Sequence, residues 1–174
     1  MVDITNDKQL ETLMMIQLTE IINEVTFLLL EKLEDNIQKY VYARKRKPAK
    51  YKRRKWNGGL LEEWEMNSAV ARGRKATAEI SENPEVMHNV PEKYVHGSLY
   101  NKKYGLTDVR EFISKMIIEG TSGDIFGDGY WMQERDFWSP TMKLLENGWI
   151  EKQIEKSFRK RGIKFQKVGN FRFG

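Results

Sequence analysis

The 174-residue sequence contains no cysteine and only two histidines, His88 and His96. Without thiols there is no disulfide framework, no thiolate nucleophile and no zinc site of the cysteine type. The two histidines lie in a polar stretch without an H-E-x-x-H helix, so we expect surface residues rather than metal ligands. The lack of cysteine suits a reducing compartment, or a particle assembled in one.

Two further binding signatures are missing. No Gly-Lys-Ser/Thr occurs, which excludes a phosphate-binding P-loop. A calcium loop starting at Asp124 would include Asp128 but would place Arg135 where calcium needs a bidentate glutamate. The four carboxylates Asp124, Asp128, Glu134 and Asp136 match no metal-binding spacing. Acidic residues beside glycine commonly form solvated turns. We expect no enzyme activity, cofactor or metal, with a metal-dependent hydrolase as a distant alternative.

Long hydrophobic runs and a signal-peptide pattern are also missing. The longest mainly apolar run, Val25 to Leu30, is far shorter than the about 20 residues that a membrane-spanning helix needs. We therefore expect a soluble protein without membrane contact. The net charge of +5 comes from one short basic stretch. We interpret this stretch as a partner-binding loop, with Arg46, Arg53, Arg54 and Lys55 among its cations.

The order of periodic patterns predicts the organisation of the chain. Apolar residues recur at helical spacing from about Thr5 to Tyr42, which indicates one long amphipathic helix. The basic stretch then contains Pro48 and leads to Gly58 and Gly59, a composition typical of an exposed loop. We expect a single domain over 1–174: an N-terminal helix (1–43), a basic loop (44–59), a hairpin, an irregular segment and two helices (60–162), and a basic-aromatic tail (163–174).

From Leu60 the apolar period changes to two. Alternation predicts a half-buried strand, and Arg72-Gly73-Arg74 is a turn signal that predicts a hairpin with the next alternating segment. The residues expected on one face of the first strand are Leu60, Trp64, Met66, Ser68 and Val70. The segment from 82 to 105 has no sustained period and predicts a long irregular excursion.

Two further helices are expected in the second half. Asp108 opens the first, and Gly120 closes it. Ser139 as N-cap and Pro140 as first helical residue start the last helix, which ends at Gly162. The fold class is therefore α+β, with a long N-terminal helix and two further helices packed on a small antiparallel sheet.

Between the two helices lies "EGTSGDIFGDGYWMQERDFWSP", residues 119 to 140, with four glycines and five aromatics. Aromatics beside a helix start are most simply core anchors, so we expect Phe137 and Trp138 to be buried. The same composition also suits a loop that inserts into a neighbouring protein. The residues expected to contact a partner are Phe126, Tyr130 and Trp131.

Three stretches, "YKRRKWNGGLLEEWE", "MIIEGTSG" and "RDFWSPTMKLLENG", carry a resemblance. Their order resembles the tail-completion and head-tail connector (neck) proteins of long-tailed bacteriophages and prophages. Lys55-Trp56-Asn57 departs from the proline and threonine usual before the Gly-Leu element. The positions that match the family pattern are Gly59, Leu60, Leu61, Trp64, Glu119, Gly120, Thr121, Arg135, Phe137 and Pro140.

The resemblance implies a non-enzymatic virion protein, assembled in the host cytoplasm, that forms a homo-oligomeric ring at the head-tail interface. Its neighbours would be portal, adaptor or tail-tube proteins, and the Gly/aromatic loop would hold a neighbouring subunit. The alternative is a nucleic-acid-binding protein that uses the basic loop from Arg44 to Lys55 together with Tyr51 and Trp56.

The C-terminal tail, "IKFQKVGNFRFG", is too apolar for a free end. An isolated two-stranded sheet is marginally stable and leaves an edge open for another strand. We therefore expect the tail to leave the last helix at Gly162 and to add a strand to the hairpin of its own chain or of a neighbour. Phe171 and Phe173 would anchor it.

Overall fold

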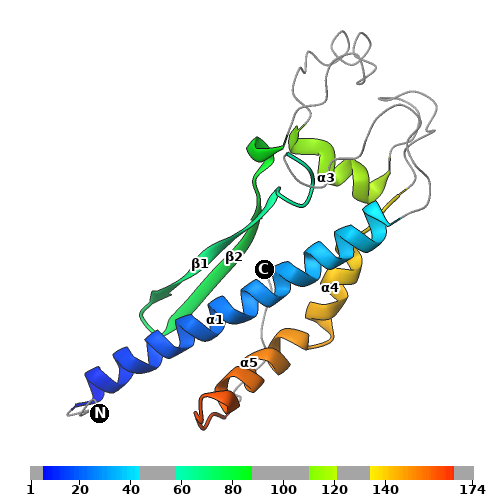
Figure 1. The fold of residues 1–174 in the computed structure, drawn as a ribbon. Coiled ribbons are helices and arrows are strands. Elements are labelled where there is room, and N and C mark those ends of the chain that lie inside the picture. Colours follow the sequence, from blue (N-terminus) through cyan, green and yellow to red (C-terminus); the bar gives the residue numbers. More distant parts are fainter. Residues whose placement is uncertain (1–5, 44–57, 88–109, 121–133, 167–174) are drawn as a thin grey trace. The chain divides into compact units, whose positions relative to one another are not determined.

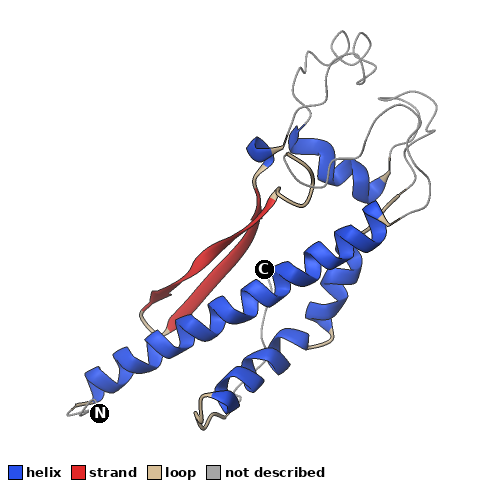
Figure 2. Ribbon diagram, viewed as in Figure 1, coloured by secondary structure: helices blue, strands red, loops and turns tan. Residues whose placement is uncertain are grey.

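The computed structural model describes residues 6–43, 58–87, 110–120 and 134–166 (Figure 1). Figure 2 shows helices and one small sheet, which confirms the α+β class. In chain order the elements are α1 (Asp7–Ile37), a π-helical turn η1 (Gln38–Tyr42), β1 (Trp64–Arg72), β2 (Lys75–Glu82), a short 3-10 helix η2 (Pro84–Val86), α3 (Arg110–Glu119), α4 (Trp138–Glu146) and α5 (Trp149–Lys160).

The chain forms two compact units, each built from separate segments. Unit 1 comprises Met1–Glu31, Met66–Ser81 and Met142–Gly174, and unit 2 comprises Lys32–Glu65 and Glu82–Thr141. Because α1, the hairpin and α4 each contribute residues to both units, this division does not follow the chain, and the expected single domain stays a prediction.

Helix α1 confirms the long N-terminal helix. The side chain of Asn6 accepts a hydrogen bond from the backbone N–H of Gln9 at 2.9 Å, which is the geometry of an N-cap. Asp7 in the first turn is also favourable for the helix dipole. At the other end the helix widens into η1, and the N–H of Ala43 closes it on the carbonyl of Gln38 at 2.8 Å.

Length and average composition would allow the helical segment Asp7–Tyr42 to cross a membrane, which is weak support for a span. The run-length argument from the sequence missed this segment, because Gln17, Glu20 and Glu24 interrupt each run without making the segment polar on average. Only 11% of its most apolar window is buried in the chain's own fold, so much apolar surface of the helix is left uncovered. The expectation of no membrane contact stays a prediction.

The hairpin β1–β2 confirms the turn at Gly73, whose φ of 58° is in the left-handed region that glycine adopts at little cost. Two details of the first strand were wrong. The strand begins at Trp64, because Leu60 lies in a buried turn that precedes it. Its expected face also fails to continue, since Val70 is 52% exposed whereas Ala69 is half-buried.

The physical reason is that burial along β1 does not follow strict alternation. Trp64 and Met66 are the more buried residues at its start, and Ala69 is the only later residue that is half-buried. The backbone N–H of Ala69 donates to the side-chain oxygen of Asn23 at 2.6 Å, which ties β1 to α1.

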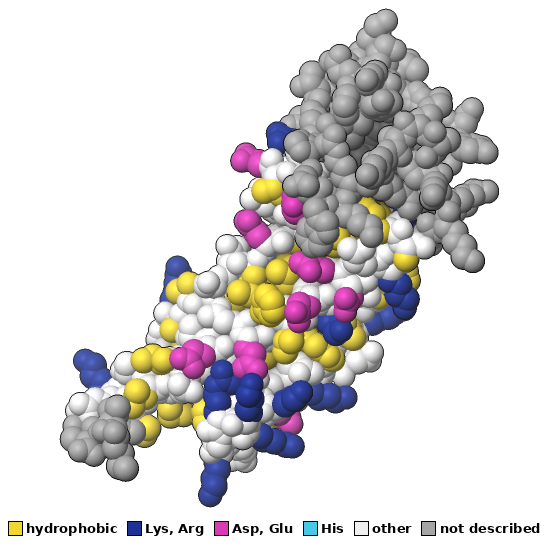
Figure 3. All heavy atoms as spheres, in the orientation of Figure 1, with side chains coloured by type: hydrophobic (Ala, Val, Ile, Leu, Met, Phe, Trp, Pro, Cys, Tyr) yellow, Lys and Arg dark blue, Asp and Glu magenta, His cyan; other side chains and the backbone are white. Residues whose placement is uncertain are grey.

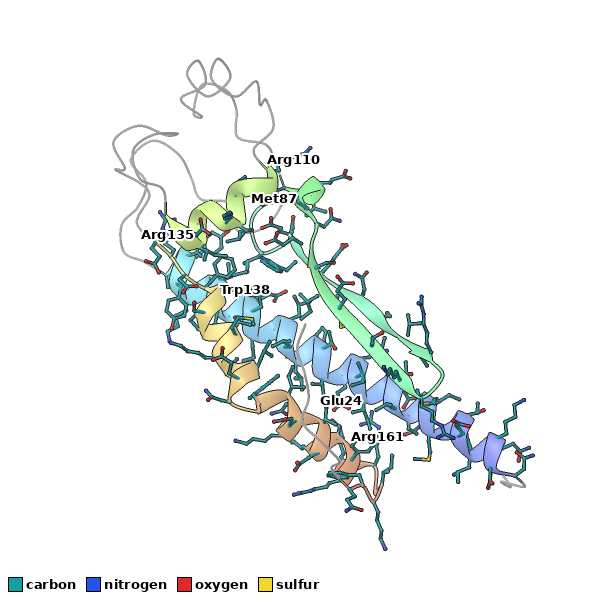
Figure 4. All side chains as sticks on the ribbon, turned by 180° about the vertical axis from the view of Figure 1, so that it is seen from behind. Glu24, Met87, Arg110, Arg135, Trp138 and Arg161 are labelled. Carbon is teal, nitrogen blue, oxygen red and sulfur yellow. The ribbon has the colours of Figure 1, made fainter. Side chains whose placement is uncertain are left out.

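The core of unit 1 lies between α1 and α5. Ile21 and Val25 of α1 are buried against Ile154 of α5. Arg161 then donates to the carboxylate of Glu24 at 2.8 Å, and Figure 4 shows the two side chains close together. This hydrogen bond is the main reason that the pKa of Glu24 is lowered. Both contacts fix α5 on α1.

The expected single last helix is two helices. Gly148 adopts a left-handed conformation with φ 69° and ψ 26°, which separates α4 from α5. The predicted cap was also wrong, because Asp136, rather than Ser139, accepts from the N–H groups of Trp138 and Ser139 at 3.0 and 2.8 Å. The predicted end holds, since α5 stops at Lys160 and Gly162 has φ 67°.

Replacing Gly148 by alanine is expected to lower the free energy of unfolding by roughly 1–2 kcal/mol, because a left-handed backbone is costly for a residue with a Cβ. That Cβ would also meet the carboxylate of Glu151. Urea unfolding measures the change. Gly148→Asn is the control, and should cost less because asparagine tolerates this conformation. An alanine variant as stable as the wild type would show that the break between α4 and α5 is not strained.

Candidate functional site

Positions from the first and third of the stretches that carry the resemblance lie in unit 2. Leu60 and Trp64, from the first stretch, are 4% and 7% exposed, and Phe137, from the third, is fully buried. The ring of Trp64 meets Phe137 edge-on, with 6.2 Å between centroids and an interplanar angle of 81°. It stacks on Trp138 with 5.3 Å between centroids. Trp64 is far in the sequence from Phe137 and Trp138, and its ring contacts both.

The predicted burial of the anchor residues is confirmed for Phe137 but not for Trp138. Phe137 is confirmed as buried, and Gly59 is buried as well. Trp138 was predicted to be buried and is 37% exposed, because one of its faces stacks on Trp64 while the rest lies at the surface. Pro140 is half-buried within α4.

The two described ends that flank residues 121–133 are held together. The backbone N–H of Arg135 donates to the carbonyl of Ile117 near the end of α3, at 2.9 Å. Gly120 follows α3 with φ 69°, a conformation that lets the chain leave the helix end. Figure 4 shows Arg135 beside α3 and Trp138 at the start of α4. The sequence predicted Arg135, Phe137 and Pro140 at the base of the Gly/aromatic loop. Because that loop lies outside the described residues, their role there stays a prediction.

A carboxyl group lies at the centre of unit 2. Glu63, which directly precedes β1, is 1% exposed. The hydroxyl of Ser114 on α3 donates to its Oε2 in a short hydrogen bond. Burial raises the pKa of Glu63 to about 7, the hydrogen bond from Ser114 opposes the shift, and the charge of Glu82 adds to it. Sequence analysis missed this pair, because nothing local connects residues 51 positions apart.

The pair of Glu63 and Ser114 has the atoms for proton transfer, but no substrate can contact a side chain that is 1% exposed. We interpret it as a structural link between α3 and the start of the hairpin. Within the described residues, no group of three or more His, Cys, Asp or Glu is arranged to hold a metal. Of the four carboxylates considered for a metal, Asp136 caps α4 and Glu134 is exposed.

The predicted partner-binding residues lie outside the described residues, so their role stays a prediction. They are Arg46, Arg53, Arg54, Lys55, Phe126, Tyr130, Trp131, Phe171 and Phe173. The same holds for His88, His96, Asp124 and Asp128. Of the tail, Ile163 to Gln166 are described and form no strand, and Phe165 stacks on Phe158 with 5.1 Å between centroids.

Two exposed surfaces of unit 1 were not predicted. The first, which we call the basic face, is the outward side of α5 and consists of Lys152, Lys156, Arg159 and Lys160. The second, the acidic stripe, runs along α1 and consists of Ile16, Glu20, Phe27 and Glu31. Their helical spacing was visible in the sequence, but which positions the fold leaves uncovered was not.

An open depression of about 610 Å³ adjoins the basic face. Its lining combines charge with apolar surface, since Arg159, Lys164 and the carboxylate of Glu155 lie beside Ile163 and Phe165. One of the two cations, Arg159, is paired with Glu155. Phe165 is 37% exposed, so an apolar side chain of a partner could contact it there. The depression widens the basic face into a mixed basic and apolar surface.

Comparison of the chain with protein-family models finds no matching family. Comparisons with curated proteins and with solved structures find no match.

Proposed function

We propose that this chain is a non-enzymatic structural protein of a tailed bacteriophage, a ring subunit at the head-tail interface that acts as completion protein, connector or tail terminator. The observation that carries the proposal is the edge-on contact of Trp64 with Phe137, since these positions come from the first and third of the stretches that resemble the neck proteins. The hydrogen bond from Arg135 to Ile117 adds support, because it closes the base of the loop proposed to hold a neighbour.

Exposed apolar side chains also favour a protein that works in an assembly. On α1, Leu10, Met14, Ile16 and Phe27 are between 43% and 59% exposed. Single exposed apolar residues are ordinary, but several along one helix are typical of an interface. In the virion such surfaces would be covered by further copies and by portal, adaptor or tail-tube proteins.

The test is the mass of the purified full-length chain, measured by light scattering after size exclusion, with negative-stain images of the same sample. We expect closed rings of one defined mass in the absence of nucleic acid, because ring contacts are made by protein surfaces. A chain that stays monomeric at every concentration, with or without phage neck proteins, would contradict the proposal.

Nucleic-acid binding is the second candidate, and the exposed basic face of α5 is the described feature that favours it. In that case the chain would bind DNA, and affinity would fall steeply with salt, with a logarithmic slope of about 0.9 for each phosphate that the chain neutralises. Reversing Arg53 and Arg54 to glutamate would lower that slope by about two. Rings that form without DNA and show no salt-sensitive DNA complex would exclude this candidate.

A further inference from the structure

We infer that neighbouring subunits of the ring meet through the basic face of one copy and the acidic stripe of the next. The inference rests on the proposed function, because it assigns the contact by which the proposed ring closes. It is carried by two surfaces of unit 1 that have opposite charge, similar length and large exposed areas, with only two long ion pairs on the basic face.

The basic face is a cationic surface with little compensation, since only Arg159 and Lys160 form ion pairs, with Glu155 and Glu24. At about 100° per residue its four cations fall within an arc of about 100°, opposite the buried Ile154. The side chains of Arg159 and Lys160 are 75% and 74% exposed, and their distances to acidic oxygens are long, 3.5 and 3.9 Å. Among the described residues, Lys152 and Lys156 form no ion pair. Figure 3 shows Lys and Arg side chains gathered where Figure 1 places α5.

Around the axis of α1, at about 100° per residue, the acidic stripe lies between the directions of Asn23 and Glu24. Both of these residues already make contacts within the subunit. Asn23 accepts a hydrogen bond from β1, and Glu24 accepts one from Arg161. Between them, Ile16 and Phe27 are 49% and 52% exposed. Glu20 is exposed too. Figure 3 shows hydrophobic and acidic side chains together along α1. The side chains of the stripe are therefore exposed, although β1 and Arg161 contact α1 on either side of it.

The two surfaces fit in length and in chemistry. Glu20 and Glu31 are separated by roughly 16 Å along the helix axis, and Lys152 and Lys160 by roughly 12 Å. Two glutamates would therefore face cations spread over a comparable distance. The apolar part of the stripe, above all Phe27, has a counterpart in the depression beside the basic face, where Phe165 is exposed. Charge would orient the contact, and burial of Phe27 would stabilise it.

A second copy of this chain is the occupant that satisfies both surfaces at once. Because the two surfaces are different patches of one subunit, their contact is heterologous, and heterologous contacts generate rings when the rotation closes. A nucleic acid would neutralise the basic face but leave the acidic stripe uncovered. A lipid surface would cover Ile16 and Phe27, but only at the cost of removing Glu20 and Glu31 from water.

Charge reversal on each surface tests the contact. One variant carries Lys152→Glu with Lys156→Glu, and the other carries Glu20→Lys with Glu31→Lys. Either variant alone would place like charges opposite each other across the contact. Each should therefore raise the concentration at which half of the subunits are assembled by about 100-fold. An equal mixture of the two variants should restore rings, because each reversed surface then meets its reversed partner. Assembly is measured by sedimentation velocity at about 0.05 M and about 0.5 M salt, since exposed charges are screened at the higher value.

The matched control for the Lys152 and Lys156 reversal is Arg72→Glu with Lys75→Glu in the hairpin, which lowers the net charge by the same amount outside both surfaces. This control should assemble as the wild type does. Circular dichroism establishes that every variant is folded. If the Lys152 and Lys156 reversal fails to fold, the milder Lys152→Gln with Lys156→Gln replaces it, with a smaller expected rise in the half-assembly concentration.

The outcomes separate the inference from the proposed function. Rings that persist unchanged in both reversed variants, or a mixture that fails to restore them, would overturn the inference and leave the ring proposal standing. A wild-type chain that never forms rings, or that only binds DNA or lipid vesicles, would overturn both. A reversal on α5 that weakens DNA binding and leaves ring assembly unchanged would assign the basic face to nucleic acid instead.

Discussion

Replacing Phe137 by alanine is expected to lower the free energy of unfolding by about 3–5 kcal/mol, the usual cost of removing a fully buried phenylalanine ring. Phe137 is 0% exposed and meets Trp64 edge-on. The deleted ring would leave a cavity at the point where the start of α4 packs against the residues around β1. Urea unfolding followed by tryptophan fluorescence measures the loss.

Two control variants test whether the loss comes from removing the buried Phe137 ring and not from any substitution in this part of the chain. Trp138→Ala removes the next aromatic, and should cost less because 37% of that side chain is already in water. Phe137→Leu keeps most of the apolar volume, so a loss below about 1.5 kcal/mol is expected, and this variant remains measurable if the alanine variant does not fold. Equal urea midpoints for Phe137→Ala and wild type would show that Phe137 does not anchor the fold.

The second large effect is a dependence of stability on pH that comes from Glu63. Its pKa is about 7 in the folded chain and 4.5 in the unfolded chain. Below about pH 4.5 the carboxyl is protonated in both states, so its contribution to stability is fully present. As pH rises toward 7 the unfolded chain loses the proton first, and stability falls. Above about pH 7 the folded chain loses it too, and the decrease levels off at about 3 kcal/mol.

Glu63→Gln isolates this contribution, because glutamine keeps the shape and the oxygen that accepts from Ser114 but cannot titrate. We expect most of the fall in stability between pH 4.5 and 7 to disappear in this variant, with only the part due to Glu82 left, and the variant to be more stable than wild type at pH 8. Urea midpoints measured across this range provide the comparison. Parallel pH profiles for the two proteins would contradict the assignment.

Ser114→Ala is the matched control for the environment of Glu63. The hydrogen bond from Ser114 lowers the pKa of Glu63, so its removal should raise that pKa further and steepen the fall in stability with pH. Glu82 has a raised pKa for the same main reason, burial, and its titration acts in the same direction. Glu24 acts oppositely, since its pKa is lowered by Arg161 and its contribution is lost as pH falls below its ordinary range. The two effects therefore occupy different pH ranges.

Local signals in the sequence were sufficient for most elements. Helical spacing predicted α1, a glycine between two alternating segments predicted the hairpin turn at Gly73, and Gly120 and Gly162 were expected at helix ends. These features depend on backbone conformation within a few residues, which the residue types control directly. The burial of Phe137 also followed, because an aromatic beside a helix start has few alternatives to the core.

Contacts between distant residues were beyond sequence patterns. The start of β1 at Trp64, the exposure of Trp138 and the hydrogen bond between Ser114 and Glu63 depend on which segments pack together. The partner-binding residues expected in the basic loop, the Gly/aromatic loop and the tail stay predictions. The sequence by itself determined α1, the hairpin turn and the ends of α3 and α5, because those follow from local conformational preference, but it did not show the break at Gly148. Only the tertiary structure decided which carboxyl group loses its water and which faces of α1 and α5 remain uncovered, because burial is a property of the packed chain.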